Sequence, residues 1–304
     1  MPLTLTFLGT GAACPSVERN VSGLAISREG ETLLIDCGEG TQRQMMRYGV
    51  GFSFREIFFT HYHADHLLGL TGLLRTMGLQ ERAAPVTLYG PKGAERVLGA
   101  ALALGIERSR FPVEIVEVKV GDRLSRAEYD MVAFETDHRA DTIGWALVEH
   151  ERLGRFDPER ARELGIPEGP LWGRIHKGEA VTVEGGRVVT PAELVGPARP
   201  GRTVVCTGDT RPAASVVEAA RGADLLVHEA TFGSDEQDRA GETGHSTAAQ
   251  AARVAEEAGV QRLVLTHISP RYSRDAPELL AEARAVFPEV AVARDGMVMD
   301  VPFR

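Results

Sequence analysis

The most constraining feature of this sequence is a run of metal-binding residue types that follows a short apolar segment. Phe58 and Phe59 end the apolar segment, and His-Tyr-His-Ala-Asp-His occupies positions 61–66. We expect a buried strand that ends at Thr60, a turn at the run, and a helix that begins near Leu67. Ligands at such a turn can converge on one point, and imidazole with carboxylate suits Zn²⁺, with Mn²⁺ or Fe as alternatives.

The spacing within this run divides its ligands between two ions. His61 and His63 alternate as on an extended segment and can reach the same ion, whereas Asp65 and His66 lie beyond the bend and can face a second ion. The alternative is a polar loop with chance histidines. It is disfavoured because three of the nine histidines of the chain lie here, around one Asp.

Composition limits the class of protein. The net charge of −9 speaks against a general nucleic-acid binder. Cys14, Cys37 and Cys206 lie far apart, which favours a reducing cytoplasm and not a disulfide framework. No apolar run is long enough to span a membrane, and the N-terminus lacks the pattern of a signal peptide. We therefore expect a cytoplasmic protein with no membrane partner.

Strand and helix patterns alternate in two stretches, one ending near residue 148 and one beginning near residue 203. This alternation predicts an α/β fold. Between about residues 150 and 200, Gly, Pro and charged residues are dense, and apolar periodicity is poor. The segment is longer than ordinary loops, which favours a functional insertion, with a disordered surface insertion as the alternative.

Three further candidate ligands, His138, Asp209 and His267, follow expected strands. Strand ends gathered at one edge of a fold are a usual place for a site, although each of these residues alone could be structural. Together with the first run they form two sets of three around a bridging Asp209. One set is His61, His63 and His138, and the other is Asp65, His66 and His267. Two ions held in this way would clamp a phosphoryl group and generate hydroxide near neutral pH.

The His-x-His-x-Asp-His pattern resembles the signature of the metallo-β-lactamase superfamily. The resemblance implies an αββα sandwich, in which two mixed sheets lie face to face with helices outside. It implies little about the substrate, which must be inferred from the rest of the chain.

Motifs spread over nearly the whole chain resemble those of ribonuclease Z, a family of tRNA 3′-processing endonucleases. His-Glu-Ala-Thr at 228–231 is similar to the family's HEAT motif, and His-Ser-Thr at 245–247 is similar to its HST loop. The turn at 36–42 is similar to an early Asp-containing turn, and 165–170 followed by Lys-Gly-Glu at 177–179 resembles its flexible arm. The resemblance implies one metallo-β-lactamase-like domain over 1–304 with a protruding arm (exosite) at about 150–200. It also implies a homodimer that acts on precursor tRNA.

The resemblance also implies a mechanism. Water activated by two Zn²⁺ ions per chain, with Mn²⁺ as an alternative, would attack the phosphodiester before the 3′ trailer and leave a 3′-hydroxyl on the tRNA. Asp65 would bind metal and accept the water's proton. We predict that His245, oriented by Glu229, protonates the leaving oxygen, because an imidazole paired with a carboxylate stays protonated nearer neutral pH. The alternatives are a Glu229 that only supports its neighbours and a His245 that only begins a helix.

Candidate tRNA contacts lie in the irregular segment. Arg174 and Lys177 closely follow Gly169 and Pro170 and could form a phosphate-binding tip. The whole segment 151–187 is neutral, because it holds seven basic and seven acidic residues.

A second set of tRNA contacts is expected near the N-terminus. Arg19 and Asn20 end a loop similar to one that this family uses to handle the 3′ end of tRNA. Val17 stands where the family often has Lys. This departure leaves open whether tRNAs that end in CCA are cleaved or rejected.

Two other functions remain as alternatives. One is another hydrolase of this fold, a small phosphodiesterase or an arylsulfatase-like enzyme, and the other is a nonenzymatic RNA-binding scaffold. Asp65 and His66, together with the HEAT and HST motifs, fit phosphodiesters better than β-lactams. A complete ligand set argues against a scaffold.

Overall fold

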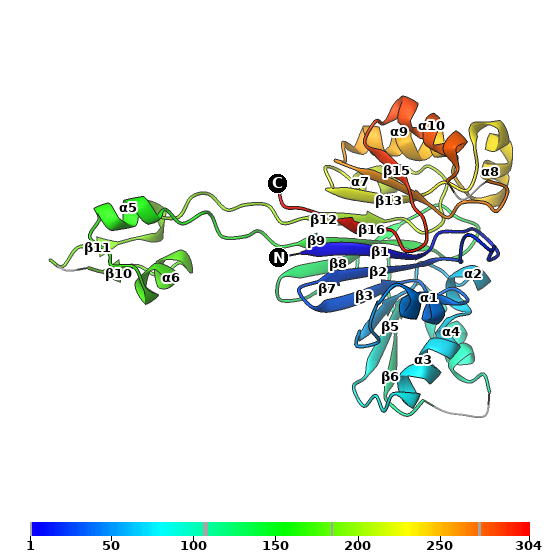
Figure 1. Cartoon of the computed structure of the whole chain (residues 1–304), viewed down its shortest axis with the longest axis horizontal. Coiled ribbons are helices and arrows are strands. Elements are labelled where there is room, and N and C mark those ends of the chain that lie inside the picture. Colours follow the sequence, from blue (N-terminus) through cyan, green and yellow to red (C-terminus); the bar gives the residue numbers. More distant parts are fainter. Residues whose placement is uncertain (1, 106–108, 184, 273–274) are drawn as a thin grey trace. The chain divides into compact units, whose positions relative to one another are not determined.

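The computed structural model describes residues 2–105, 109–183, 185–272 and 275–304. These residues divide into two compact units (Figure 1). Unit 1 consists of Met1–Val148 and Thr203–Pro302, and unit 2 consists of Glu149–Arg202 with Phe303–Arg304. The irregular segment of the sequence therefore folds as a unit of its own, joined by the last two residues of the chain.

Two seven-stranded sheets form the centre of unit 1 (Figure 1). In order across the first sheet, the strands are β16 (Val298–Asp300), β1 (Leu3–Gly9), β2 (Gly23–Arg28), β3 (Glu31–Ile35), β4 (Glu56–Phe58), β5 (Val86–Gly90) and β6 (Val113–Glu117). Across the second, they are β15 (Val290–Val292), β14 (Leu263–Thr266), β13 (Leu225–Glu229), β12 (Thr203–Cys206), β9 (Ile143–Glu149), β8 (Tyr129–Glu135) and β7 (Arg123–Ser125). Both sheets are mixed: β1 is antiparallel to β2 while β3 is parallel to β4, and β12 is antiparallel to β9 while it is parallel to β13.

Helices cover the outer faces of both sheets. The first sheet is covered by α1 (Thr41–Arg47), α3 (Leu70–Leu79) and α4 (Ala94–Leu102). The second is covered by α7 (Ala214–Ala219), α9 (Ala248–Ala258) and α10 (Pro277–Val286). The connections contain α2 (Ala64–Leu67), α8 (Gln237–Thr243) and a 3₁₀ turn η2 (Ser234–Glu236). The predicted arrangement, two mixed sheets with helices outside, is confirmed.

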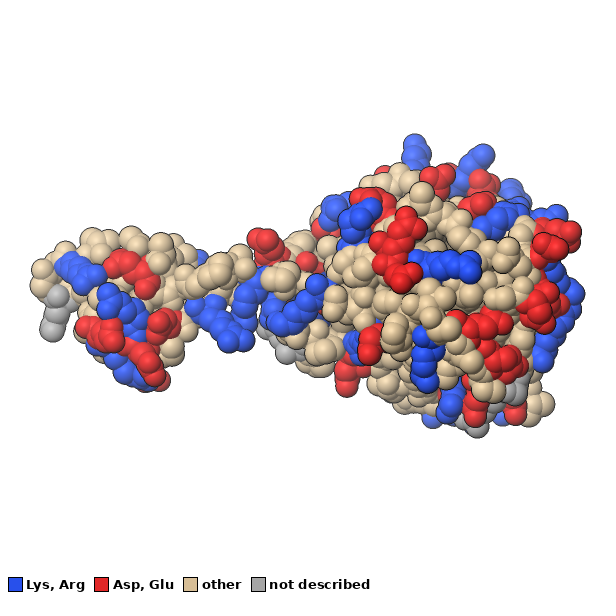
Figure 2. All heavy atoms as spheres, turned by 90° about the horizontal axis from the view of Figure 1, so that it is seen from above, with Lys and Arg blue, Asp and Glu red and all other residues tan. Residues whose placement is uncertain are grey.

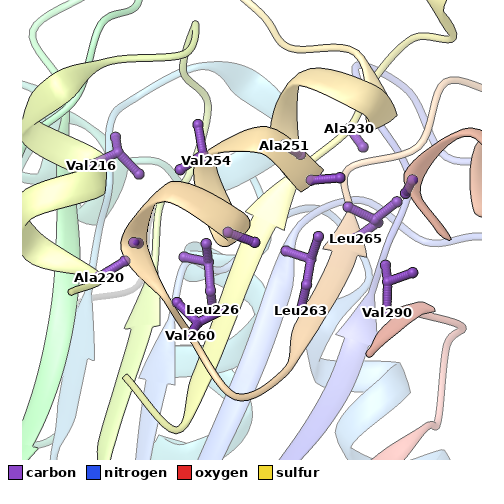
Figure 3. Packing of buried hydrophobic residues seen from close by; sticks show 14 of the residues in the cluster. Val216, Ala220, Leu226, Ala230, Ala251, Val254, Val260, Leu263, Leu265 and Val290 are labelled. Carbon is purple, nitrogen blue, oxygen red and sulfur yellow. The ribbon is translucent and has the colours of Figure 1, made fainter. Parts of the chain in front are cut away.

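The alternation of side chains along each strand explains the layers. Leu225 and Val227 of β13 lie in the core between the sheets, whereas Leu226 lies in the core under the helices. Figure 3 shows Leu226 of β13 and Leu263 of β14 beside α9, whose buried face is almost entirely alanine. Because successive strand residues point to opposite faces, strands that are apolar on both faces must be covered on both faces.

Unit 2 contains short elements: α5 (Pro158–Glu163), α6 (Pro170–His176), β10 (Val181–Thr182), β11 (Val188–Val189) and a 3₁₀ turn η1 (Pro191–Glu193). Its own apolar cluster is Ala161, Ile166, Ile175, Val181, Val189 and Leu194. Elements of two to seven residues are too short to show a period in the sequence, which is why the segment looked irregular.

In place of the single helix expected to begin near Leu67, the structure has two helices, α2 and α3. Gly69 lies at the break, where its N–H donates to the carbonyl of Cys37 at 2.9 Å. A Cβ at Gly69 would lie 2.0 Å from the carbonyl oxygen of Gly38, so this close approach of two backbone segments requires glycine. Within the described residues, no helix is long and apolar enough to cross a membrane.

Candidate metal and catalytic site

The predicted ligands come together at one edge of unit 1, because each follows a strand. His61 and His63 follow β4, His138 follows β8, Asp209 follows β12 and His267 follows β14. Asp65 and His66 lie in α2, which begins directly after His63. The turn between β4 and α2, with the start of α2, therefore carries four ligands within six residues, and these face the three ligands that come from distant parts of the sequence.

One cluster consists of His61, His63 and His138. The Nδ1 atom of His63 lies 3.0 Å from Nε2 of His61 and 3.3 Å from Nε2 of His138. The Oδ2 atom of Asp209 lies 3.6 Å from Nε2 of His61 and 3.9 Å from Nε2 of His138.

A second cluster consists of Asp65, His66 and His267. Nε2 of His267 lies 3.2 Å from Oδ2 of Asp65 and 3.4 Å from Nε2 of His66. The other oxygen of Asp209, Oδ1, lies 3.3 Å from Nε2 of both histidines. The structure thus brings together all seven predicted ligands, with the two oxygens of Asp209 facing different clusters.

The ring nitrogens of His61 and His66 that face away from the clusters make hydrogen bonds of a kind that fits a cation bound at the opposite ring nitrogens. Nδ1 of His66 donates to Oδ2 of Asp36 at 2.7 Å. Nδ1 of His61 lies 3.1 Å from the hydroxyl of Thr60, which donates to the same Asp36 oxygen at 2.8 Å. These bonds assign the proton to Nδ1 and leave the Nε2 lone pairs pointing inward, where only a cation or protons can satisfy them.

The bridging carboxylate supports the same conclusion. Oδ1 of Asp209 is buried and makes no hydrogen bond within the described residues. A buried carboxylate oxygen without a donor is costly. Imidazole nitrogens and carboxylate oxygens in two adjoining groups are a donor set for divalent ions, so the residues present fit such ions.

Glu229 joins the second cluster to His245. Nδ1 of His245 donates to Oε1 of Glu229 at 2.8 Å. The other carboxylate oxygen, Oε2, accepts from the hydroxyl of Thr231 at 2.9 Å, and this hydroxyl lies 2.9 Å from Nδ1 of His267. Thr231 therefore donates to Glu229, accepts from His267, and leaves Nε2 of His267 for the cluster.

His245 lies between the end of α8 and the start of α9, and both helix ends hold it in place. Gly244 ends α8 with a φ of +87°, and its carbonyl accepts from Nδ1 of His138 at 2.7 Å. Thr247 begins α9 with a reciprocal pair of hydrogen bonds to Gln250. Burial alone would lower the pKa of His245, but the carboxylates of Glu229 and Asp209 outweigh it and raise the pKa to about 9.

His245 has a second possible role. One nitrogen of His245 lies within 4.8 Å of ligand atoms of Asp209 and His267, so this trio could also hold an ion. The predicted ligand set left His245 out.

Sequence reasoning missed several contributors to the site. Asp36 and Thr231 were noticed only as parts of motifs, and Thr60 only as the end of a strand. A hydroxyl or carboxylate next to a ligand in sequence is a weak signal, because its role depends on the hydrogen bond it makes.

Two arginines at the opening of the site were also missed. A cleft of about 340 Å³ is lined by His63, His245, Phe232, Arg239 and Arg271, among others. The guanidinium carbons of Arg239 and Arg271 lie 5.8 and 6.0 Å from the centre of the Phe232 ring. Both arginines also face Glu236, whose Oε1 lies 3.1 Å from Nη1 of Arg271 and 3.8 Å from Nη1 of Arg239. Two guanidinium groups against one carboxylate leave a net positive charge at this opening, which suits an anionic substrate.

The candidate tRNA contacts near the N-terminus lie differently from expectation. Arg19 is only 3% exposed, and its Nη1 donates to the Thr10 hydroxyl and to the Ala293 carbonyl, each at 2.7 Å. The side chain of Asn20 donates to the carbonyl of Glu39 at 2.8 Å. The expectation of a direct RNA contact from Arg19 is therefore corrected, because its guanidinium is used inside unit 1 to hold the loop.

The other candidate tRNA contacts lie in unit 2. Gly169 precedes α6 with a φ of +153°, and Pro170 is the first residue of that helix. Nε of Arg174 lies 2.7 Å from Oε2 of Glu179, whereas Lys177 is exposed and makes no ion pair with the described residues.

The chain is similar to proteins of known name and to solved structures. Residues 3–145 match the family model described as anti-Pycsar protein Apyc1, and residues 174–268 match a beta-lactamase superfamily domain. A protein named ribonuclease Z from Gemmatimonas aurantiaca is 57% identical over 303 residues, which cover 99% of this chain and 96% of that protein. One of the same name from Myxococcus xanthus is 54% identical, with 99% of each chain covered. The crystal structure of the short form of human tRNase Z has a TM-score of 0.70 and 28% identity, covering 99% of this chain and 100% of that one.

Proposed function

The chain belongs to the ribonuclease Z family, and on this basis we propose that it is a metal-dependent endoribonuclease that removes the 3′ trailer from tRNA precursors. The products are a 3′-hydroxyl on the tRNA and a 5′-phosphate on the trailer. The observation that carries the proposal is the hydrogen-bonded link from the second ligand cluster through Thr231 and Glu229 to His245. This link supports the proposal, because His245 would then serve as a proton donor beside the bound cations.

We assign two Zn²⁺ ions per chain, with Mn²⁺ as the alternative. His61, His63 and His138 would hold one ion, Asp65, His66 and His267 would hold the other, and Asp209 would bridge them. When bound, such ions supply a nucleophile from water and offset charge on the phosphoryl oxygens.

Asp65 acts first as a ligand. Burial would raise its pKa, but the hydrogen bond from His267 and the charge of His66 outweigh burial and keep the pKa well below its usual range. The carboxylate is therefore ionised at neutral pH and can accept a hydrogen bond from the attacking water. The Ala13 N–H, which donates to Oδ2 of Asp65 at 2.8 Å, fixes its orientation.

His245 protonates the leaving 3′-oxygen. Its Nδ1–H is held by Glu229, so the N–H at Nε2 is the one available to the substrate. The raised pKa keeps this imidazole protonated at neutral pH, as a general acid requires.

We further propose that unit 2 is the family's arm, that Gly169, Pro170, Arg174 and Lys177 contribute to tRNA binding, and that the protein acts as a homodimer. Lys177 supports this, because its exposed ammonium has no acidic partner in the described chain. Asn20 remains a candidate for the 3′ end of the tRNA.

The test is incubation of the protein with a 3′-extended tRNA precursor, followed by mapping of both new ends. We expect one cut, a 3′-hydroxyl on the tRNA and a 5′-phosphate on the trailer. Nitrocefin and bis-p-nitrophenyl phosphate serve as controls for β-lactamase and general phosphodiesterase activity. Hydrolysis of the small diester with intact precursor tRNA would favour the small-phosphodiesterase alternative.

A further inference from the structure

Residues 149–156 and 195–202, where the chain enters and leaves unit 2, are joined by two antiparallel bridges, Arg152–Arg199 and Phe156–Val195, and we call them the stalk. The N–H of Arg152 donates to the carbonyl of Arg199 at 2.8 Å, and the N–H of Arg199 donates back at 2.9 Å. Arg152 and Arg199 are therefore directly opposite each other in an antiparallel pair. Like charges in this position destabilise a strand pair, so their placement needs an explanation.

The arginines of the stalk use only part of their hydrogen-bonding capacity. Nε and Nη2 of Arg152 donate to the Pro200 carbonyl at 3.3 Å, and Nε of Arg199 donates to the Leu153 carbonyl at 3.1 Å. Arg155 is exposed, and its side chain makes no hydrogen bond or ion pair with the described residues. No carboxylate of the described chain forms an ion pair with any of these three arginines.

The arginines in the rest of unit 2 differ, because most of them have an acidic partner. The pairs are Arg160 with Glu163, Arg162 with Glu168, Arg174 with Glu179 and Arg187 with Glu193, at 2.7, 3.5, 2.7 and 2.8 Å. In Figure 2 the side chains along the narrow stalk are mostly basic, with acidic ones near its end, whereas both signs of charge are mixed over the helices of unit 2. Unit 2 therefore has a basic stalk, although equal numbers of acidic and basic residues make the segment 151–187 neutral overall.

The stalk also holds Arg152 in a fixed orientation. Its guanidinium carbon lies 3.4 Å from the centre of the Phe303 ring, and that of Arg202 lies 3.8 Å from the same centre. Arg202 is neutralised by Glu149, with Nη2 2.6 Å from Oε1. A guanidinium stacked on a ring loses less conformational entropy when it binds a ligand.

We propose that Arg152, Arg155 and Arg199 form a phosphate-binding strip for the RNA backbone, an inference that rests on the proposed function. Guanidinium groups bind phosphate through paired N–H donors, and a phosphate between Arg152 and Arg199 removes their repulsion. The strip binds all tRNAs alike, because phosphates carry no sequence information. It places the main electrostatic contact of unit 2 on the stalk, with a smaller contribution from Arg174, whose charge is partly neutralised by Glu179.

The test compares two triple variants of the full-length, metal-loaded protein that remove the same charge from unit 2. R152Q/R155Q/R199Q removes the strip, and R160Q/R162Q/R187Q removes three arginines that already have acidic partners. The dissociation constant for a mature tRNA is measured by filter binding from low to high KCl. Cleavage of a precursor tRNA and hydrolysis of bis-p-nitrophenyl phosphate are measured in parallel.

We expect the strip variant to reduce the slope of log Kd against log salt concentration by about 2, from three phosphate contacts at roughly 0.7–0.9 each. Its KM for precursor tRNA should rise about tenfold or more near physiological salt, with kcat and small-diester hydrolysis unchanged. R160Q/R162Q/R187Q should change the slope by less than half as much. R152K/R155K/R199K should keep most of the slope, because lysine keeps the charge.

Equal slopes for the strip variant and the wild type, or equal effects of the two Gln triples, would overturn the strip. So would a Lys triple as impaired as the Gln triple, since the effect would then depend on stacking and not on charge. If the wild type binds tRNA but cleaves no precursor, the proposed function fails, while the binding slopes still decide the inference. Should R152Q/R155Q/R199Q unfold, R155Q/R199Q preserves the Arg152–Phe303 stack and should still reduce the slope by about 1–2.

Discussion

Replacing Glu229 with Gln keeps the shape of the side chain but removes the charge beside His245. Oε1 accepts from the N–H of Thr210 at 3.1 Å and from Nδ1 of His245 at 2.8 Å. Oε2 accepts from the N–H of Thr231 at 3.0 Å and from its hydroxyl at 2.9 Å. Every partner is a donor in this arrangement, so the NH₂ group of Gln must face a backbone N–H in either orientation.

The substitution should change both the free energy of unfolding and the pKa of His245. Glu229 is 1% exposed, and a buried donor left without an acceptor costs about 1–3 kcal/mol, or more where a charged group loses its partner. We expect the free energy of unfolding to fall by about 2–4 kcal/mol. Because Glu229 is the chief cause that raises the pKa of His245, its loss leaves burial less opposed and lowers that pKa from about 9.

The lower pKa of His245 predicts the direction in which the pH dependence of kcat will move. Protonated His245 is the general acid, so activity declines as pH rises through its pKa. Glu229→Gln should move the alkaline limb of kcat for precursor tRNA to lower pH by about one unit or more. Glu218→Gln is the matched control, because Glu218 is exposed and pairs with Arg221 on the surface. An alkaline limb that stays in place while kcat falls would refute the role of His245 as the acid.

Three further predictions concern the same site and unit 2. His245→Ala should lower kcat by about 10²–10⁴-fold with metal content unchanged, and elemental analysis showing metal loss would make His245 a ligand instead. Elemental analysis of fully active protein should approach two divalent ions per chain, and chelation should lower the melting temperature, because ions that bind only the folded state stabilise it; a reproducible value near one would contradict the two-ion assignment. Replacing residues 155–187 with a short Gly-Ser linker should leave small-diester hydrolysis largely intact and raise KM for precursor tRNA, and unchanged kcat/KM for the precursor would exclude this segment from tRNA binding.

The alternation of strands and helices predicted an α/β fold, and the resemblance of the His-x-His-x-Asp-His pattern implied the two-sheet sandwich. The partition of the ligands was predicted from the spacing of the residues within that pattern. His61, His63, Asp65 and His66 lie at a turn whose geometry follows from the strand before it and the helix after it. Asp209 could be placed as a bridge because the first run needed partners from other strand ends.

The rest depends on distances that no local pattern contains. Arg19 donates a hydrogen bond to the carbonyl of Ala293, which is far away in sequence. Arg152 stacks on Phe303, which is also far from it along the chain. Counting charges over residues 151–187 gave a neutral segment, because a count cannot separate arginines with an acidic partner from those without one. The elements of unit 2 escaped notice because its helices have fewer than two full turns and its strands have two residues each, too few for a repeating pattern to show.

The stalk has a consequence for how the polypeptide folds. β9 and β12 are neighbours in the second sheet, with Val148 opposite Thr203, although all of Glu149–Arg202 separates them in sequence. Each doubling of a closed loop costs about 0.6 kcal/mol, so pairing two strands across such a length would cost roughly 2 kcal/mol more than closing a tight hairpin. Unit 2 has its own apolar cluster and joins its ends through the Arg152–Arg199 bridge, so once it has formed it acts as a short connection. A segment that interrupts the sheet in sequence thereby brings the two halves of the sheet into register.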